Sequence, residues 1–323
     1  MGDVEFSSFL TNSGKKYLVF FIIGMVMNIL DVVVPIFSLM AIGWAIRRLG
    51  YLSNRVLDGI NNYVYFIGIS LITFVSLHDI DLSTLIDVDV YLLNIVPMLA
   101  ALIIAYFVAK KLGLEKKLLP VFILCAFFGN TGYIGFPVNV VILGSDSLTA
   151  AAFISTIYTV FVFTIGIFVI QKTSEKGGKS NKIYKIPIIW AAVLGLALSW
   201  VAIPDMLRLP INLISESVSP LALFATGAMV ASAGSRIDIK EIGLVSIIKL
   251  IILPAMVILV GMAAGDNSGI LYKSSLLEAA TPVAVTNTIL AAQFRLNYNF
   301  ASNAVVISTV LFAITLPIVM YFL

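Results

Sequence analysis

The sequence predicts an all-α membrane protein of about ten transmembrane helices, arranged as two inverted halves of five. Sixty per cent of its 323 residues are hydrophobic and only 11% are charged, whereas a soluble domain carries about a quarter charged residues. Apolar runs of roughly 20 residues, long enough to cross a bilayer, recur along the chain, and lysines and arginines gather in every second loop. Lipid is therefore the expected solvent around most of the chain.

Ten apolar runs are separated by short polar segments. Because backbone groups in lipid must be hydrogen-bonded within their own segment, runs of this length are expected to be helices. The expected spans are residues 29–47, 59–77, 90–110, 120–143, 147–170, 186–203, 211–233, 240–264, 270–293 and 300–322.

The basic residues predict the orientation of these spans. Fifteen of the 20 lysines and arginines fall in the loops after spans 1, 3, 5, 7 and 9. Loops rich in lysine and arginine stay on the cytoplasmic side, so both termini are expected on the outer side of the cell membrane.

The central segment 172–185 is rich in Gly, Ser and Lys and is expected to be a cytoplasmic linker. It separates a first five-helix repeat, 29–171, from a second, 186–323. Because each half holds an odd number of spans, the second half must insert upside down relative to the first. Inverted repeats of this kind are a common architecture of secondary transporters.

A weak internal echo accompanies this division. Pro35 and Gly43 in span 1 recur as Pro187 and Gly195 in span 6, at a constant offset of 152 residues.

Residues 1–28 are treated as an N-terminal extension. Within them and just beyond, residues 17–30 are apolar and follow Lys15 and Lys16. Four interpretations are open: an extension of the first helix, an interfacial segment, a cleaved signal, or a segment upstream of a native start at Met27.

Spans 4 and 9 contain residues that break helices near mid-membrane. Span 4 reads CAFFGNTGYIGFPV, and span 9 reads LLEAATPVAVTNTIL. Glycine weakens a helix, and proline removes a donor and clashes with the preceding turn. Such breaks are tolerated in a membrane where the opened backbone lines a protein cavity.

A broken helix exposes a new N-terminus with a partial positive charge. Two broken helices that cross at the midplane would present two such ends to an anion, with Asn and Thr side chains as further donors. The sequence therefore predicts an anion site that needs no buried arginine.

The motifs GNTGYIGFPV, SPLALFATGAM, IIKLIILP and LLEAATPVAVTNTILAAQF, followed by STVLFAITLP, resemble the auxin efflux carrier family over about residues 28–323. This family includes bacterial malonate-type carriers and is related in fold to plant auxin exporters and bile-acid symporters. Span 2 departs from the family pattern, because it reads FIGIS (66–70) where a proline near mid-span is usual.

The resemblance implies a scaffold of spans 1, 2, 6 and 7, a transport domain of spans 3–5 and 8–10 that moves as an elevator, and a homodimer formed through the scaffold. It also implies that a small organic anion, a dicarboxylate or an auxin-like carboxylate, binds where spans 4 and 9 cross. The substrate-binding residues implied in this way are Asn130, Thr131, Gly132, Tyr133, Pro137, Thr281, Pro282, Thr286 and Asn287.

Charges inside spans are scarce, and the two best candidates for a functional role are Lys249 in span 8 and Glu278 in span 9. Intramembrane charges usually pair or line a pathway. They are candidates for coupling to Na⁺ or H⁺, and the alternative is that they fix packing between helices. The acidic outer loop that holds His78 and Asp79 is expected to be solvated and screened.

Other functions find little support. A single cysteine, Cys125, and a single histidine, His78, leave no metal cluster and no nucleophile–base pair within the membrane. We therefore expect no enzyme, no cofactor, no metal site and no nucleic-acid partner. A cation antiporter would need carboxylates at the breaks, and a sensor would not need two matched breaks; both stay as alternatives.

Overall fold

A computed structural model of the chain describes residues 34–80, 87–114, 117–173, 187–231, 238–265 and 268–323. These residues are helical, and no strand occurs among them. The predicted extension 1–28 and residues 174–185 of the predicted linker lie outside the described residues. The all-α class is confirmed for the part of the chain that is described.

Six of the described helices are long and apolar enough to cross a membrane, and each matches a predicted span. They run over Asn54–His78, Val88–Lys111, Ser147–Ile170, Asp205–Val230, Ile239–Ala264 and Tyr298–Met320. Within the described residues the other predicted spans are shorter or divided helices, so the full set of ten spans stays a prediction.

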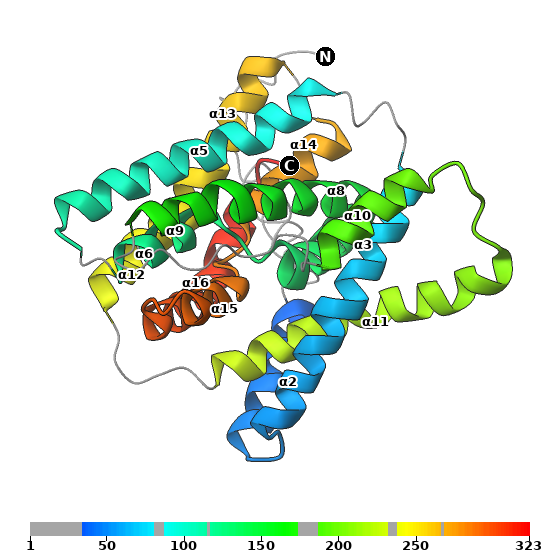
Figure 1. Cartoon of the computed structure of the whole chain (residues 1–323), viewed down its shortest axis with the longest axis horizontal. Helices are drawn as coiled ribbons and strands as arrows, with labels where there is room; N and C mark the ends of the chain where they lie inside the picture. Colours follow the sequence, from blue (N-terminus) through cyan, green and yellow to red (C-terminus); the bar gives the residue numbers. More distant parts are fainter. Residues whose placement is uncertain (1–33, 81–86, 115–116, 174–186, 232–237, 266–267) are drawn as a thin grey trace, which may run out of the picture.

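The elements follow one another along the chain (Figure 1). After the helical residues 34–48, they are α2 (Asn54–Asn62), η2 (Tyr63–Ile69), α3 (Ser70–His78), α5 (Val88–Lys111), α6 (Leu119–Phe127), η3 (Thr131–Gly135), α7 (Phe136–Leu143), α8 (Ser147–Phe161), η4 (Val162–Gly166), α9 (Ile167–Thr173), α10 (Pro187–Ala197), α11 (Asp205–Val230), α12 (Ile239–Ile247), η6 (Ile248–Ile252), α13 (Leu253–Ala264), α14 (Ile270–Ala280), α15 (Thr286–Gln293) and α16 (Tyr298–Met320).

Polar residues begin several helices by accepting hydrogen bonds from first-turn amides, which have no partner inside a helix. The Ser53 hydroxyl accepts from the amide of Val56 at 3.3 Å at the start of α2. The Asn297 side chain accepts from the amide of Phe300 at 3.0 Å at the start of α16. These caps fix the residues at which α2 and α16 begin.

The helices gather into two neighbouring groups. In one, α11 lies crosswise against α2, η2 and α3, and α10 packs on α3 (Figure 1). In the other, α5 packs on α6, α13 and α14, and α16 contacts α12, α14 and α15. Helix α8 contacts both groups, because it packs on α3 as well as on α14 and α5.

Span 2 contains a π-helical turn, η2, at the place where the family pattern has a proline. Turns of this kind widen a helix locally and often occur at functional sites. Here Gly68 lets α11 approach closely, since a Cβ at Gly68 would lie 2.4 Å from Val218 Cγ2. The last residue of η2, Ile69, reaches the site described below.

The two glycines of the predicted internal echo sit at equivalent close contacts. A Cβ at Gly43 would lie 2.0 Å from the carbonyl oxygen of Phe224 in span 7. A Cβ at Gly195 would lie 2.5 Å from the carbonyl oxygen of Phe74 in span 2. Small residues at such crossings let helix backbones touch in a membrane.

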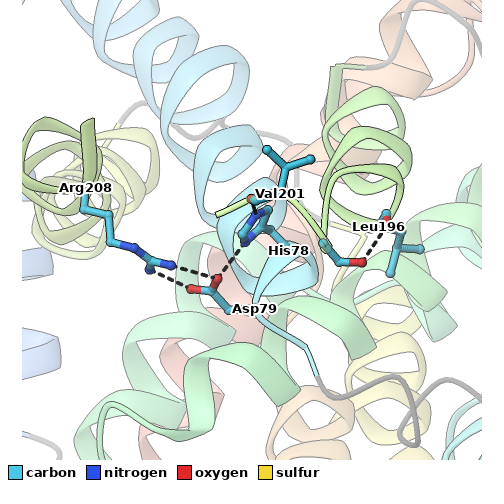
Figure 2. Close-up of polar contacts among 6 residues, drawn as sticks. His78, Asp79, Leu196, Val201 and Arg208 are labelled. Carbon is cyan, nitrogen blue, oxygen red and sulfur yellow. Dashed lines mark hydrogen bonds and ion pairs between the residues drawn. The ribbon is translucent and has the colours of Figure 1, made fainter. Parts of the chain in front are cut away.

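A polar network ties the end of α3 to the start of α11 (Figure 2). His78 is buried, and its two ring nitrogens lie 2.6 Å from Asp79 Oδ1 and 2.8 Å from the carbonyl oxygen of Val201. Arg208 donates to both carboxylate oxygens of Asp79, at 3.0 and 3.3 Å. The expectation of a solvated loop is therefore wrong for His78, which is buried, whereas Asp79 is exposed and pairs with a residue far away in the sequence.

This network predicts a pH dependence of stability. Burial alone would raise the pKa of Asp79, but hydrogen bonds from Arg208 and His78 and the Arg208 charge hold it below its ordinary value of 3.8. A carboxylate with a lowered pKa stabilises the fold above its unfolded pKa, and this contribution is lost as the pH falls through the folded pKa.

We expect Asp79→Asn to lower the melting temperature by a few degrees at most at neutral pH, because the pair is partly exposed and screened. The difference from the wild type should persist down to about pH 3.8 and shrink as the pH falls below it, because the folded-state pKa of Asp79 lies below that value. Thermal unfolding in detergent across this range checks the prediction, and a difference that is constant with pH would contradict it.

Candidate functional site

Two helices are interrupted in the middle of the molecule. Helix α6 ends at Phe127, and the chain becomes helical again at Thr131. Helix α14 ends at Ala280, and α15 begins at Thr286. The glycine- and proline-containing motifs of spans 4 and 9 are therefore the places where the helices stop.

The two interruptions cross and bond to each other as short extended segments. The amide of Asn130 donates to the carbonyl oxygen of Pro282 at 2.8 Å, and the amide of Ala284 donates to that of Phe128 at 3.0 Å. Gly129 and Val283 thereby form an antiparallel bridge. Each break thus supplies partners for backbone groups that the other leaves open, as a low-dielectric interior requires.

Close packing at the crossing explains Gly129. A Cβ at this position would lie 2.3 Å from Thr281 Oγ1 and 2.8 Å from Lys249 Nζ. Pro282 fits its own position because it has no amide hydrogen to satisfy, while its carbonyl is used.

A pocket of about 400 Å³, a volume that includes space open to solvent, lies at the crossing. Both restarting helices reach it, with Thr131 at the start of the η3–α7 helix and Thr286 at the start of α15. Its lining residues are Ile69, Phe128, Gly129, Asn130, Thr131, Gly132, Tyr133, Ser155, Thr159, Phe163, Ala284 and Thr286.

The pocket is polar without being acidic. Asn130 is 4% exposed, and its side-chain Nδ2 has no hydrogen-bond partner among the described residues. The hydroxyls of Thr131 and Ser155 lie 2.7 Å apart, and the Tyr133 hydroxyl donates to the carbonyl oxygen of Asn61 at 3.3 Å. Within the described lining no side chain carries a carboxylate.

The residues that the resemblance implied as substrate-binding divide into two sets. Asn130, Thr131, Gly132, Tyr133 and Thr286 line the pocket. The other four are buried around the crossing and are not part of this lining; they are Pro137, Thr281, Pro282 and Asn287.

The second set has structural partners. Asn287 donates from Nδ2 to the carbonyl oxygen of Phe128 at 3.3 Å, which ties α15 to the break in span 4. The Thr281 hydroxyl donates to the carbonyl oxygen of Glu278 at 2.7 Å and closes the end of α14.

Lys249 and Glu278 meet beside the crossing. Both are fully buried, and the Lys249 ammonium donates to the carbonyl oxygen of Ala279, the residue after Glu278. Glu278 Oε1 accepts from Asn139 Nδ2 at 3.0 Å, and Oε2 has no hydrogen-bond partner in the described part of the chain. Neither residue lines the pocket, and their role in coupling stays a prediction.

Sequence reasoning missed several lining residues. Ser155 and Thr159 come from α8, Ile69 from η2 and Phe163 from η4. The four-residue spacing of Ser155 and Thr159 places both on one face of a helix. That spacing was an available signal, although Thr149, Thr156 and Thr164 in the same span do not line the pocket.

Comparison with known proteins decides the family. The model of a family described as membrane transport protein matches residues 28–320. The chain belongs to this family. The resemblance to auxin efflux carriers is thereby confirmed, and the family and its named members are transporters rather than enzymes. The chain is an integral membrane protein.

Relatives of this membrane transport protein match either nearly the whole chain or part of it. An uncharacterized transporter of Methanothermobacter thermautotrophicus is 27% identical over 301 residues, covering 89% of this chain and 96% of the relative. A Rhizobium meliloti protein, named as a candidate malonate transporter, is 22% identical over 307 residues, covering 91% and 95%. Auxin efflux carrier component 8 of Arabidopsis thaliana is 30% identical over 140 residues, covering 43% of this chain and 37% of its own.

Proposed function

We propose that this protein is a secondary-active transporter of a small organic anion, which binds in the pocket beside the crossing of spans 4 and 9. The substrate class is a dicarboxylate or an auxin-like carboxylate. The observation that carries the proposal is that two helix N-termini and the unpartnered Asn130 amide line one pocket.

The electrostatics of the pocket favour an anion. The first amides of a helix lack partners within it, and the N-terminus carries roughly half a positive charge. Two such ends, at Thr131 and Thr286, line a pocket whose described walls hold no carboxylate. The hydroxyls of Thr131, Ser155 and Thr159 add donors, and Ile69 and Phe163 supply apolar surface for a carbon chain.

Relatives' names narrow the choice of probes. One relative is named for malonate and another for auxin efflux. Both molecules are carboxylates, which is the chemistry that converging helix N-termini bind. Malonate and indole-3-acetate are therefore the first compounds to test.

An elevator of two inverted five-helix halves is the proposed mechanism. The equivalent close contacts of Gly43 and Gly195 support a two-fold relation between the halves, 29–171 and 186–323. The group of α2, α3, α10 and α11 is the proposed scaffold, and Ile69 from this group touches the pocket beside Gly132. Motion between the groups would then expose the pocket to alternate sides.

Placement in the cell membrane with both termini outside follows from the positive loops, and the scaffold homodimer is also part of the proposal. A symporter or antiporter coupled to Na⁺ or H⁺ is the second candidate, because Glu278 is fully buried with an unpartnered oxygen within the described residues.

Asn130→Ala tests the proposed site. Because the Asn130 amide has no partner in the described structure, its removal should leave stability near that of the wild type. Uptake of the transported carboxylate into proteoliposomes should fall by about tenfold, the effect of one charge-assisted hydrogen bond. Asn212→Ala, at an exposed position of α11, is the control.

Asn287→Ala should behave differently. Its amide holds the carbonyl of Phe128 across the crossing, so its loss should lower the melting temperature as well as uptake. Wild-type uptake by both asparagine variants would show that the site is elsewhere.

A further inference from the structure

Lys249 is a fully buried cation within a membrane span. It lies in η6, a π-helical turn in the middle of the Ile239–Ala264 helix, and none of its surface is exposed. A charge in this position is costly unless it is paired. Its surroundings therefore have to supply negative charge.

The ends of the two broken helices supply part of it. The C-terminal carbonyls of a helix carry a partial negative charge, and the Lys249 ammonium donates to Ala279, in the last turn of α14. The ammonium also lies against the break after α6, since a Cβ at Gly129 would be 2.8 Å from Nζ. One ammonium thus bonds the C-terminal end of α14 and lies beside the break that follows α6.

Glu278 supplies the full charge. It lies in the last turn of α14, directly before Ala279; one carboxylate oxygen accepts from Asn139 and the other has no hydrogen-bond partner among the residues described. Thr281 Oγ1 adjoins the same place, 2.3 Å from the position of a Gly129 Cβ. A backbone carbonyl, a carboxylate and a hydroxyl are the oxygen donors that hard cations prefer.

We propose that Lys249 is a tethered cation that occupies a latent monovalent-cation site at the C-terminal ends of the broken helices. Because the ammonium already neutralises these ends and Glu278, the protein needs no free Na⁺ to form the crossing. Removing the side chain leaves a net negative cavity of oxygen donors that a small cation can enter.

If the protein carries an anion as proposed above, the inference predicts that anion uptake is not coupled to Na⁺; this part rests on the proposed function. The cation site itself does not depend on which anion is carried. Lys249 belongs to this site rather than to the anion pocket, whose lining does not include it.

Thermal unfolding of purified protein in NaCl, KCl, ethylammonium chloride and choline chloride tests the site without any anion substrate. The melting temperature of the wild type should be the same in all four salts. That of Lys249→Ala should rise by about 2–4 °C in NaCl or ethylammonium relative to choline, because ligands that bind only the folded state stabilise it. Lys273→Ala is the matched control, and should show no such rise.

Adding Glu278→Gln to Lys249→Ala should abolish the salt response, because the cation loses its counter-charge. A folded Lys249→Ala protein that responds to no cation would overturn the proposal. A wild-type protein whose melting temperature is higher in NaCl than in choline chloride, or whose carboxylate uptake requires Na⁺, would overturn it too. This measurement does not depend on any variant folding. If the salt response is found and carboxylates are not transported, the proposed function fails and the cation site stands.

Discussion

Gly135→Ala should abolish transport. A Cβ at this position would lie 2.0 Å from Glu278 Oε2 and 2.6 Å from its Cδ. Glu278 is fully buried between α7 and the crossing, and Asn139 holds its other oxygen at 3.0 Å. The added methyl must therefore displace the carboxylate from Asn139, and overpacking of this kind costs about 1–3 kcal/mol.

We expect uptake into proteoliposomes to fall below a tenth of the wild-type rate, with a measurable loss of thermal stability, since each 1.4 kcal/mol corresponds to a factor of about ten. Gly243→Ala in α12 is the matched control, because a Cβ there meets nothing within 4 Å. Near-normal uptake by Gly135→Ala would show that Glu278 does not need its present position.

Gly227→Ala should have the largest effect on folding. A Cβ at Gly227 would lie 1.8 Å from the carbonyl oxygen of Met40, and one at Gly43 would lie 2.0 Å from that of Phe224. The helix of residues 34–48 and α11 therefore touch backbone to backbone. Because backbone atoms cannot rotate away, the helices must separate, at a cost of about 3 kcal/mol or more.

The expected result is a large loss of folded protein on size-exclusion chromatography in detergent. Gly59→Ala in α2 has open space around its Cβ and should elute as the wild type does. A Gly227→Ala protein with unchanged melting temperature would mean that the two helices can move apart without loss.

The spans could be predicted because one physical signal, the length of an apolar run, decides them. The same run of residues cannot say how a broken span continues. Gly129, Asn130 and Pro282 predicted the two breaks. The backbone hydrogen bond between Asn130 and Pro282, however, joins two segments that are distant in sequence.

Which polar side chains face the pocket also depends on that crossing. Asn130 and Asn287 looked equivalent in the sequence. One lines the pocket with an unpartnered amide among the described residues, while the other bonds Phe128 outside the lining. Ser155 was overlooked because α8 has no break of its own; it reaches the pocket by packing against η3 and α14.

The buried charges illustrate the same limit. The sequence singled out Lys249 and Glu278 because charges are rare in spans. The hydrogen bond from the Lys249 ammonium to Ala279, at the C-terminal end of α14, could be found only from the folded structure. Likewise, Arg208 and Asp79 are 129 positions apart and meet only in the folded chain.

Substrate protection of a single cysteine tests the central claim most directly. Thr286, at the start of α15, lines the pocket, and Cys125 is the single native cysteine and is buried. In a Cys125→Ser background, malonate or indole-3-acetate, whichever is transported, should slow the labelling of Thr286→Cys by a thiol reagent and leave that of Ser145→Cys, exposed in the turn between α7 and α8, unchanged. Equal labelling of Thr286→Cys with and without the transported anion would contradict binding at the crossing.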